Sequence, residues 1–294
     1  MTLEQLAIFV AVAERQHLTR AAEALRLTPS AVSAAIKALE TGHNVRLFDR
    51  IGRGIELTRE GRAFLDQARI VLAHAQSARD LLRDLGGTGS PTLDIHASQT
   101  IASYWLPPRL VRFHDAYPQV DIRLHVGNTQ QVAEAVRDGR AEIGFAEGAI
   151  EDPALSVERL AEDHLVVVVR PDHPLTARAA LRPADLLAGT EWIMREAGSG
   201  TRSEFEAGLR ALGCDPQALS VALTLPSNEA ILSAVREGNC AAAVSRSAAA
   251  PFLDSGDMVA LGAVLPARSF LLVRHRERHP GPASKKLEEM CKSV

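Results

Sequence analysis

The stretch LTRAAEALRLTPSAVSAAIKALE, residues 18–40, decides the fold of the N-terminal part of the chain. Alanine-rich helical patterns lie on either side of Arg26 and Leu27, and the second pattern begins with Thr28 and Pro29. Threonine is a good helix N-cap, and proline at the first helical position loses no hydrogen bond, because that N–H has no partner within a helix. Small side chains let two helices approach closely, and a two-residue connector sets them at a sharp angle. The stretch therefore predicts a helix-turn-helix.

Two further caps place the neighbouring helix starts. Thr2 and Gln5 have the spacing of a capping box, which predicts a helix from about residue 3. We expect Thr19 to cap the first helix of the helix-turn-helix. Three consecutive helices are thus predicted before residue 45.

The helix that begins after Thr28 has an apolar side and a polar side. Val32, Ile36 and Leu39, spaced by four and three residues, face the core. The opposite side is short, polar and uncluttered, which suits insertion into the major groove of DNA. The residues expected at DNA on this side are Thr28, Pro29, Ser30, Ser33, Ala34 and Lys37.

A basic hairpin is predicted directly after this helix. In RLFDRIGRGIELTREG, residues 46–61, strand-like pieces at 46–49 and 55–57 bracket a turn that holds Arg50 and Arg53. We expect these two arginines to contact DNA phosphates. An ordinary surface hairpin with solvated arginines is the alternative.

A long helix is predicted from residue 58 to about residue 86. Its apolar residues recur with alternating spacings of four and three over about three heptads, the pattern of a coiled coil. The seam consists of Phe64, Ala68, Val71, Ala75, Ala78, Leu82 and Leu85. This seam favours dimerisation, and a helix that packs on its own domain is the alternative. GGTGSP, residues 86–91, predicts a flexible connection to the rest of the chain.

The rest of the chain alternates strand and helix patterns. Strands are expected from Thr92, Val120, Ala141, Leu165, Glu191, Cys240 and Ser269, with helices near 104–116, 129–138, 201–212, 228–237 and 282–292. Such alternation is typical of an α/β domain with mostly parallel sheets covered on both faces. We expect two lobes with a cleft between them.

Polar side chains follow several of these strands, and the segment REAGSGTR, residues 195–202, precedes a helix start. Open α/β sheets bind ligands at the carboxyl ends of their strands, and a helix start with small residues offers free N–H groups to an anion. The candidate effector-binding residues are Ser98, Thr100, Asn128, Thr129, Arg195, Ser199, Thr201, Arg202 and Ser227. The alternative for each polar strand end is a cap on its own helix. We expect the ligand to be a small anionic metabolite.

Composition and motifs exclude several classes of protein. The net charge is -3, but residues 1–90 carry 12 Lys and Arg against 10 Asp and Glu, so a DNA-binding surface has to rest on the placement of its cations. The sequence contains no HExxH, GxSxG or GxGxxG motif, which argues against an enzyme, and no metal or cofactor is expected. Cys214, Cys240 and Cys291 lack metal-ligand spacing. No apolar run approaches the roughly 20 residues of a membrane span, and the N-terminus resembles an amphipathic helix more than a secretion signal, so we expect a cytoplasmic protein.

The chain resembles the LysR-type transcriptional regulators over nearly its whole length. The segments that carry the resemblance are FVAVAERQHLTRAAEALRLTPSAVSAAIKALE (9–40), VRLFDR (45–50) and GIELTREG (54–61). The segments HASQTIASYWLPPRLVRFHDAYPQV (96–120), VGNTQQVAEAVRDGRAEIGFAEG (126–148) and REAGSGTR are similar to the branch that contains regulators of sulfur assimilation and carbon fixation. His43 and Asn44 stand where the family usually has a Leu-Gly pair, and asparagine is an acceptable left-handed helix cap. Ala34 stands where many members have a longer polar residue.

The resemblance implies a domain organisation and a function. Residues 1–58 would form a winged helix-turn-helix, residues 59–89 a dimerising linker helix and hinge, and residues 90–294 an effector domain shaped like a type 2 periplasmic binding protein, with lobes of residues 90–161 with 267–294 and of residues 162–266. The implied protein is a homotetramer that binds double-stranded promoter DNA, responds to a small effector in the interlobe cleft and contacts RNA polymerase. The alternative is a regulator that ignores small molecules, or one that responds to thiol oxidation through Cys214 or Cys240.

Overall fold

The computed structural model of the chain describes residues 1–294 except 52–53, 86–90, 179–182, 263–264 and 293–294. Contacts divide the chain into two compact units, residues 1–89 with 138–140 and residues 90–137 with 141–294. The first unit contains the predicted helix-turn-helix, and the second contains the α/β part.

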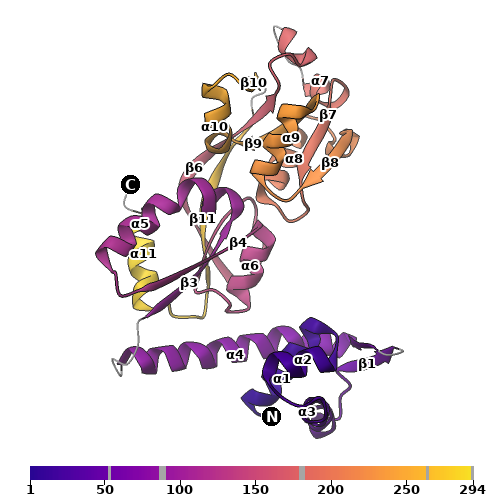
Figure 1. Cartoon of the computed structure of the whole chain (residues 1–294), viewed down its shortest axis with the longest axis vertical. Helices are drawn as coiled ribbons and strands as arrows, with labels where there is room; N and C mark the ends of the chain where they lie inside the picture. The colour runs from indigo at the N-terminus through magenta and orange to yellow at the C-terminus, as the bar shows by residue number, and fades with distance from the viewer. Residues whose placement is uncertain (52–53, 86–90, 179–182, 263–264, 293–294) are drawn as a thin grey trace. The chain divides into compact units, whose positions relative to one another are not determined.

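Three helices, a two-stranded hairpin and one long helix build the first unit (Figure 1). Its elements are α1 (Leu3–Arg15), α2 (Leu18–Leu25), α3 (Pro29–His43), β1 (Phe48–Ile51), β2 (Gly54–Leu57) and α4 (Arg59–Leu85). Between α2 and α3, Arg26 adopts a left-handed conformation at φ 55°, and the N–H of Leu27 donates to the carbonyl of Ala22 at 2.9 Å. This tight connection confirms the predicted helix-turn-helix.

The helix caps agree with the sequence in two cases and differ in one. Thr2 and Gln5 form the predicted capping box, and the Thr28 hydroxyl accepts the N–H of Ala31 at 3.2 Å with proline next in the chain. The prediction that Thr19 caps α2 is wrong. His17 takes this role, because its Nδ1 atom accepts the N–H of Arg20 at 3.4 Å, and Thr19 therefore lies within the helix.

The core of the first unit is apolar and centred on α1. Val32, Ile36 and Leu39 of α3 are buried in it, as predicted. The ring of Phe9 lies 5.4 Å from that of Phe48 in β1 and 5.0 Å from that of Phe64 in α4, measured between centroids. Helix, hairpin and long helix therefore share one core.

The hairpin begins two residues later than predicted. The carboxylate of Glu40 in α3 accepts the N–H groups of Leu47 and Phe48 at 2.8 and 3.1 Å. The sequence predicted a strand from residue 46, but these two amides are hydrogen-bonded to α3. As a result Arg50 pairs with Ile55 within the β1–β2 ladder and does not lie in the turn. The side chain of Arg50 and the whole of Arg53 lie outside the described residues, so their phosphate contacts stay a prediction.

One end of the apolar seam of α4 is packed in the core of the first unit, and the rest of the seam is more exposed. Phe64 and Ala68 pack into the core of the first unit, so the alternative of packing on its own domain describes this end of the seam. Farther along, Ala75 is half-buried and Ala78 is exposed, while Val71 is 41% and Leu82 70% exposed. The side chain of Leu85 lies outside the described residues.

The second unit contains two lobes (Figure 1). One lobe holds β3 (Thr92–Ser98), a π-helical turn (Ile101–Trp105), α5 (Pro107–Ala116), β4 (Asp121–Gly127), α6 (Thr129–Arg137), β5 (Ile143–Glu147) and α11 (Pro282–Lys292). The other holds α7 (Pro183–Ala188), β7 (Glu191–Arg195), α8 (Gly200–Ala211), β8 (Val221–Leu225), α9 (Asn228–Glu237), β9 (Cys240–Ser245), α10 (Arg246–Asp254) and β10 (Val259–Leu261). The long strands β6 (Leu155–Val169) and β11 (Ala267–His275) connect the two lobes.

The strand order in the described residues is β4-β3-β5-β11-β6-β9-β7-β8, with β10 added to β6. Pairs within each lobe, β3 with β4 and β5 and β7 with β8 and β9, are parallel as predicted. The connecting strands β6 and β11 pair antiparallel with each other and with their neighbours β9 and β5. Strand β10 also pairs antiparallel with β6. The prediction of mostly parallel sheets therefore holds for the pairs that do not involve β6 or β11.

Sequence patterns missed several elements of the second unit. Strand β8 is an exposed edge strand, and the first part of β6, residues 155–164, carries four charged residues among apolar ones without a regular alternation. Helix α10 carries Pro251 in its interior. The irregular charges of residues 155–164 and the proline of α10 interrupt strand and helix patterns, whereas β8 carries a strand-like sequence, VALTL, that the prediction did not include.

Gly61 in the first turn of α4 gives a test of the first unit. A Cβ atom at this position would lie 2.1 Å from the carbonyl oxygen of Leu47, so any side chain there overpacks the contact between α4 and the hairpin. We expect Gly61→Ala to lower the free energy of unfolding by about 1–3 kcal/mol, measured by urea denaturation of the full chain. Gly42→Ala is the control, because a Cβ atom at that position would have nothing within 4 Å and alanine favours a helix by up to about 1 kcal/mol. Equal stability of the two variants would contradict the close contact.

Candidate functional site

The outer side of α3 presents the residues that the sequence assigns to DNA contact. Thr28, Pro29, Ser30, Ala34 and Lys37 are exposed and Ser33 is half-buried. Their small side chains leave room for close approach to base edges, and Lys37 adds a positive charge. The first unit therefore offers the short polar helix face that was predicted.

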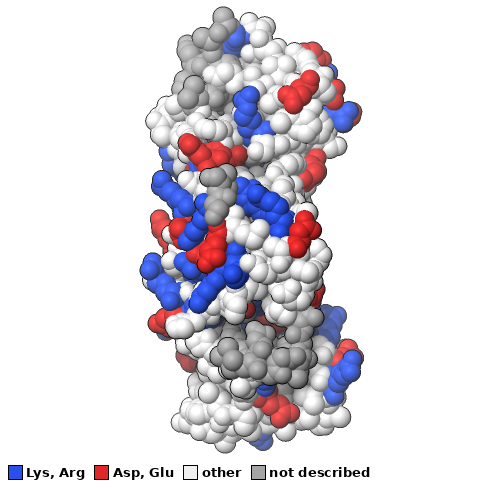
Figure 2. All heavy atoms as spheres, turned by 90° about the vertical axis from the view of Figure 1, so that its left-hand side faces the viewer, with Lys and Arg blue, Asp and Glu red and all other residues white. Residues whose placement is uncertain are grey.

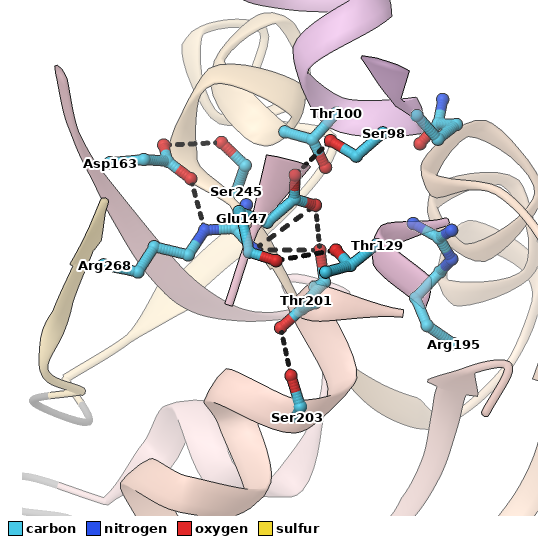
Figure 3. A network of polar contacts seen from close by, with 12 residues as sticks. Ser98, Thr100, Thr129, Glu147, Asp163, Arg195, Thr201, Ser203, Ser245 and Arg268 are labelled. Atoms are coloured by element: carbon cyan, nitrogen blue, oxygen red, sulfur yellow. Dashed lines mark hydrogen bonds and ion pairs between the residues drawn. The ribbon is translucent and has the colours of Figure 1, made fainter. Parts of the chain in front are cut away.

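Strand ends from both lobes of the second unit meet around the carboxylate of Glu147, the last residue of β5, which is 2% exposed (Figure 3). The hydroxyl of Ser98 donates a hydrogen bond to Glu147 Oε2. From the other lobe, Thr201 Oγ1 lies 3.5 Å from Glu147 Oε1. Within the same lobe as Glu147, Thr129 donates to the backbone carbonyl of Glu147 at 2.6 Å. Three of the predicted effector residues thus gather around an acidic side chain that the sequence analysis did not single out.

Arg268 at the start of β11 connects this carboxylate to a second one. Its Nε atom donates to Asp163 Oδ2 at 2.7 Å, and its Nη1 atom donates to Thr201 Oγ1 at 3.0 Å and lies 3.8 Å from Glu147 Oε1. Ser245 donates to the other oxygen of Asp163 at 2.8 Å. The Nη2 atom of Arg268 is buried and has no hydrogen-bond partner among the described residues. One guanidinium therefore faces two buried carboxylates (Figure 3).

A second cluster at the lobe junction contains Thr100, Asn128 and Arg195. Asn228 donates to Thr100 Oγ1 at 3.1 Å and accepts from Arg195 Nη1 at 3.5 Å. Arg195 also holds Glu196 through two hydrogen bonds of 2.8 and 3.0 Å, and Asn128 donates to Glu196 at 3.3 Å.

The charge of Arg195 is already matched within this cluster. Burial acts to raise the pKa of Glu196, but the guanidinium of Arg195 and the hydrogen bond from Asn128 outweigh it, so the pKa lies below its ordinary value. Glu196 is therefore ionised at neutral pH and neutralises the buried arginine. Arg195 is thus paired with Glu196 and does not offer a free positive charge to a ligand. The hydroxyl groups of the junction remain as the candidate donors to a ligand.

A third cluster joins the lobes through α9. Gln99 and Tyr104 of one lobe donate to the carboxylate of Glu229 in the other at 2.6 and 2.9 Å, and Gln99 also accepts the N–H of Asn228 at 3.1 Å. Burial and then the hydrogen bond to Glu229 raise the pKa of Tyr104, so its hydroxyl stays protonated as a donor. The sequence analysis did not single out Gln99, Tyr104 or Glu229, since nothing local marks their contacts.

An open groove of about 570 Å³ lies beside the Glu147 cluster, between the start of α6, residues 149–152 and the start of α8. Thr129, Ser199 and Arg202 of the predicted site line it. Ser199 is 3% exposed, and its hydroxyl has no hydrogen-bond partner among the described residues. Arg202 is held by Glu206 at 2.8 Å and by the carbonyl of Arg195 at 3.2 Å.

Two predicted residues also cap their helices, as the alternative stated. Ser227 accepts the N–H of Ala230 at 3.1 Å at the start of α9. Asn128 Oδ1 accepts the N–H of Gln131 at 3.0 Å, while its amide nitrogen reaches the other lobe. Ser227 thus has a structural role, and the effector roles of all nine predicted residues stay predictions.

The cysteines are free and poorly suited to oxidation. Burial raises the pKa of Cys291 to about 11, and burial and then Glu191 raise the pKa of Cys240. Cys214 is buried in the core of its lobe. Because the thiolate is the reactive form, raised pKa values lower reactivity at neutral pH.

Charge on the surface of the second unit is mixed. On the face shown in Figure 2, Lys and Arg side chains lie among Asp and Glu. Glu288 of α11 pairs with Arg274, and Lys292 of the same helix pairs with Glu158, both at 2.8 Å.

No group of three or more His, Cys, Asp or Glu among the described residues could hold a metal ion. None of the helices within the described part of the chain is both long enough and apolar enough to cross a membrane.

A winged helix-turn-helix joined to a two-lobed α/β unit with a polar junction defines a class of DNA-binding regulators with an effector domain. The chain matches the bacterial regulatory helix-turn-helix protein, lysR family, over residues 3–62 and the LysR substrate binding domain over residues 86–294. The chain therefore belongs to the LysR family of transcriptional regulators, and it is a DNA-binding regulator and not an enzyme.

Relatives and solved structures agree with this family. The chain is 36% identical to the uncharacterized HTH-type transcriptional regulator YeiE of Escherichia coli (strain K12), over 99% of this chain and 97% of that protein. It is 33% identical to a probable RuBisCO transcriptional regulator of Cyanophora paradoxa, over 87% of this chain and 79% of that protein. The fold is similar to that of full-length CbnR complexed with its target DNA, with a TM-score of 0.67, 23% identity and 99% of both chains covered.

The buried network gives a test of what holds the lobe junction. Arg268→Ala leaves Asp163 and Glu147 buried without their cation, and breaking a buried pair in this way costs about 3–5 kcal/mol. We expect a loss of unfolding free energy of this size in urea denaturation. Arg123→Ala is the matched control, because Arg123 pairs with Asp121 on the exposed surface, and such pairs contribute little. A loss no larger than that of the control would show that Arg268 does not hold the junction.

Proposed function

We propose that this LysR-family regulator binds specific promoter sites as an oligomer and changes that binding when a small effector enters the junction between the lobes of its second unit. The supporting observation is the polar lobe junction, where side chains far apart in sequence donate and accept across the two lobes. Such contacts differ between an open and a closed arrangement, so a ligand that prefers one arrangement shifts the protein toward it. This activity would take place in the cytoplasm, where promoter DNA and RNA polymerase are found.

The DNA contact is assigned to α3 and the hairpin. The exposed residues Ser30, Ala34 and Lys37, together with half-buried Ser33, would lie in the major groove. Arg50 and Arg53 would contact phosphates, which adds affinity without sequence preference.

Dimerisation is assigned to the free part of the α4 seam. Val71 and Leu82 are large apolar side chains exposed on a single helix, and such residues in heptad spacing pack against a second helix. Phe64 and Ala68 serve the core of the first unit instead. A second contact between dimers would give the homotetramer.

The effector is assigned to the junction and the neighbouring groove. The groove has the size of small-molecule sites, and Ser199, whose hydroxyl is an unused donor, lines it. Arg268 Nη2 is a second unused donor, buried in the Glu147 cluster. Hydroxyl and guanidinium donors beside the N-terminus of α8 favour an anionic group. The raised pKa of Cys240 and the burial of Cys214 argue against the alternative of thiol regulation through these two residues.

Leu82→Asp tests the dimer. A buried charge in a helix pair is strongly unfavourable, so we expect the variant to sediment as a species of half the size, with an unchanged far-UV circular dichroism spectrum. Ala63→Asp makes the same kind of change at an exposed position of α4 off the seam, and it should keep the assembly intact. Wild-type sedimentation of Leu82→Asp would remove the seam from the interface.

DNase footprinting on the DNA next to the protein's own gene tests the whole proposal. The titration is repeated at fixed salt with a panel of small anions, since affinity for DNA changes steeply with salt. We expect one anion to shift, shorten or strengthen the protected site. Protection that ignores every anion would refute effector control by small anions, and an absence of protection would refute promoter binding there.

A further inference from the structure

The carboxylate of Glu147 takes the place that an anionic ligand would occupy at the lobe junction. Its two oxygens face the hydroxyl of Ser98 from one lobe and that of Thr201 from the other. Its own backbone is held separately, because Thr129 donates to the Glu147 carbonyl at 2.6 Å. The side chain could therefore turn away without moving the end of β5.

The donors around this carboxylate form a receptor for a small anion. Two hydroxyl groups, one of them on the second residue of α8, and a buried guanidinium present hydrogen-bond donors, and buried charges require such compensation. The Nη2 atom of Arg268 still has no partner among the described residues, so the receptor holds one more donor than Glu147 uses. A free carboxylate could use that donor as well.

Glu147 pairs less closely with Arg268 than Asp163 does. Asp163 lies 2.7 Å from the guanidinium and also accepts from Ser245, whereas Glu147 lies 3.8 Å from it and 3.5 Å from Thr201. Two negative charges share one positive charge, so the less well-paired carboxylate is the one that a competitor can replace.

An entry route lies beside the cluster. Thr129, which holds the Glu147 backbone, also lines the groove of about 570 Å³, as do Ala149 and Ile150 just after Glu147 in the chain. Gly148, which lies between Glu147 and Ala149, has a φ of +90°, a conformation that favours glycine. It lets the chain turn directly after Glu147. The groove thus reaches the segment that carries the carboxylate.

We propose that Glu147 is a built-in ligand of an anion site formed by Ser98, Thr201 and Arg268, and that a small carboxylate binds there by displacing it. This inference rests on the proposed function and names its ligand class. The internal carboxylate closes the junction when no effector is present. It also raises the effector concentration that is needed, because the effector has to compete with a tethered group.

Removal of the internal carboxylate tests the proposal directly. Glu147→Ala leaves the donors without their ligand, so sodium formate should bind in its place and raise the melting temperature, compared with sodium chloride at equal ionic strength. Titration calorimetry should show formate binding at least tenfold tighter to Glu147→Ala than to the wild-type protein. Glu151→Ala, which removes an exposed acid from the groove lining, should bind formate no better than wild type.

A second variant covers the case in which Glu147→Ala does not fold. Glu147→Gln keeps the shape of the side chain but places an amide NH₂, which cannot accept a hydrogen bond, next to the donors of the site. This variant should therefore also bind formate at least tenfold tighter than wild type. Formate affinity equal to that of wild type in the folded variants would overturn the proposal. So would equal gains in Glu151→Ala, since the effect would then come from the loss of any negative charge.

The footprint separates this inference from the proposed function. Tight formate binding by the Glu147 variants with an unchanged footprint would support the site and refute its coupling to DNA. A footprint that responds to an anion at the same concentration in wild type and in Glu147→Gln would support effector control and overturn the built-in ligand.

Discussion

Arg268 stands between two buried carboxylates, and the arrangement of the second unit depends on that charge. Asp163 belongs to β6, Glu147 ends β5, and Arg268 is the second residue of β11. Buried charges are costly unless they are paired, so these three strands have to keep their register where the lobes meet. The parallel pairing of β3 with β5 brings Ser98 to the Glu147 carboxylate, and Arg268 itself donates to Thr201. The guanidinium that pairs the carboxylates therefore also contacts a hydroxyl donor of the junction.

The first unit could be predicted largely from local sequence. Caps such as Thr28 and the spacing of Val32, Ile36 and Leu39 report interactions within a few residues, and local patterns capture such interactions well. The two errors have a different origin. His17 caps α2 through a ring nitrogen, which cap preferences do not favour, and Glu40 reaches seven residues ahead to hold the start of the hairpin.

The polar residues that follow strands in the candidate site could be predicted from the sequence, but their partners could not. Polar residues after strands, such as Ser98 and Thr201, are visible because the rule about strand ends is local. Their partners are not visible, since Ser98 lies 49 residues from Glu147 and Arg268 lies 105 residues from Asp163. The sequence also suggested that Arg195 offers charge to a ligand, whereas the neighbouring Glu196 already neutralises it. Hydroxyl donors could be foreseen, but the distribution of charge around them could not.

The shared use of α4 sets the smallest piece of this regulator that can fold by itself. A fragment cut after the hairpin, at residue 58, would lose Phe64, Ala68 and Leu72 and leave the rings of Phe9 and Phe48 partly uncovered. A DNA-binding module transplanted to another protein therefore has to carry α4 at least through Leu72. From that point on, the exposed seam is free to be replaced, and a different coiled coil could be attached in phase with the same helix.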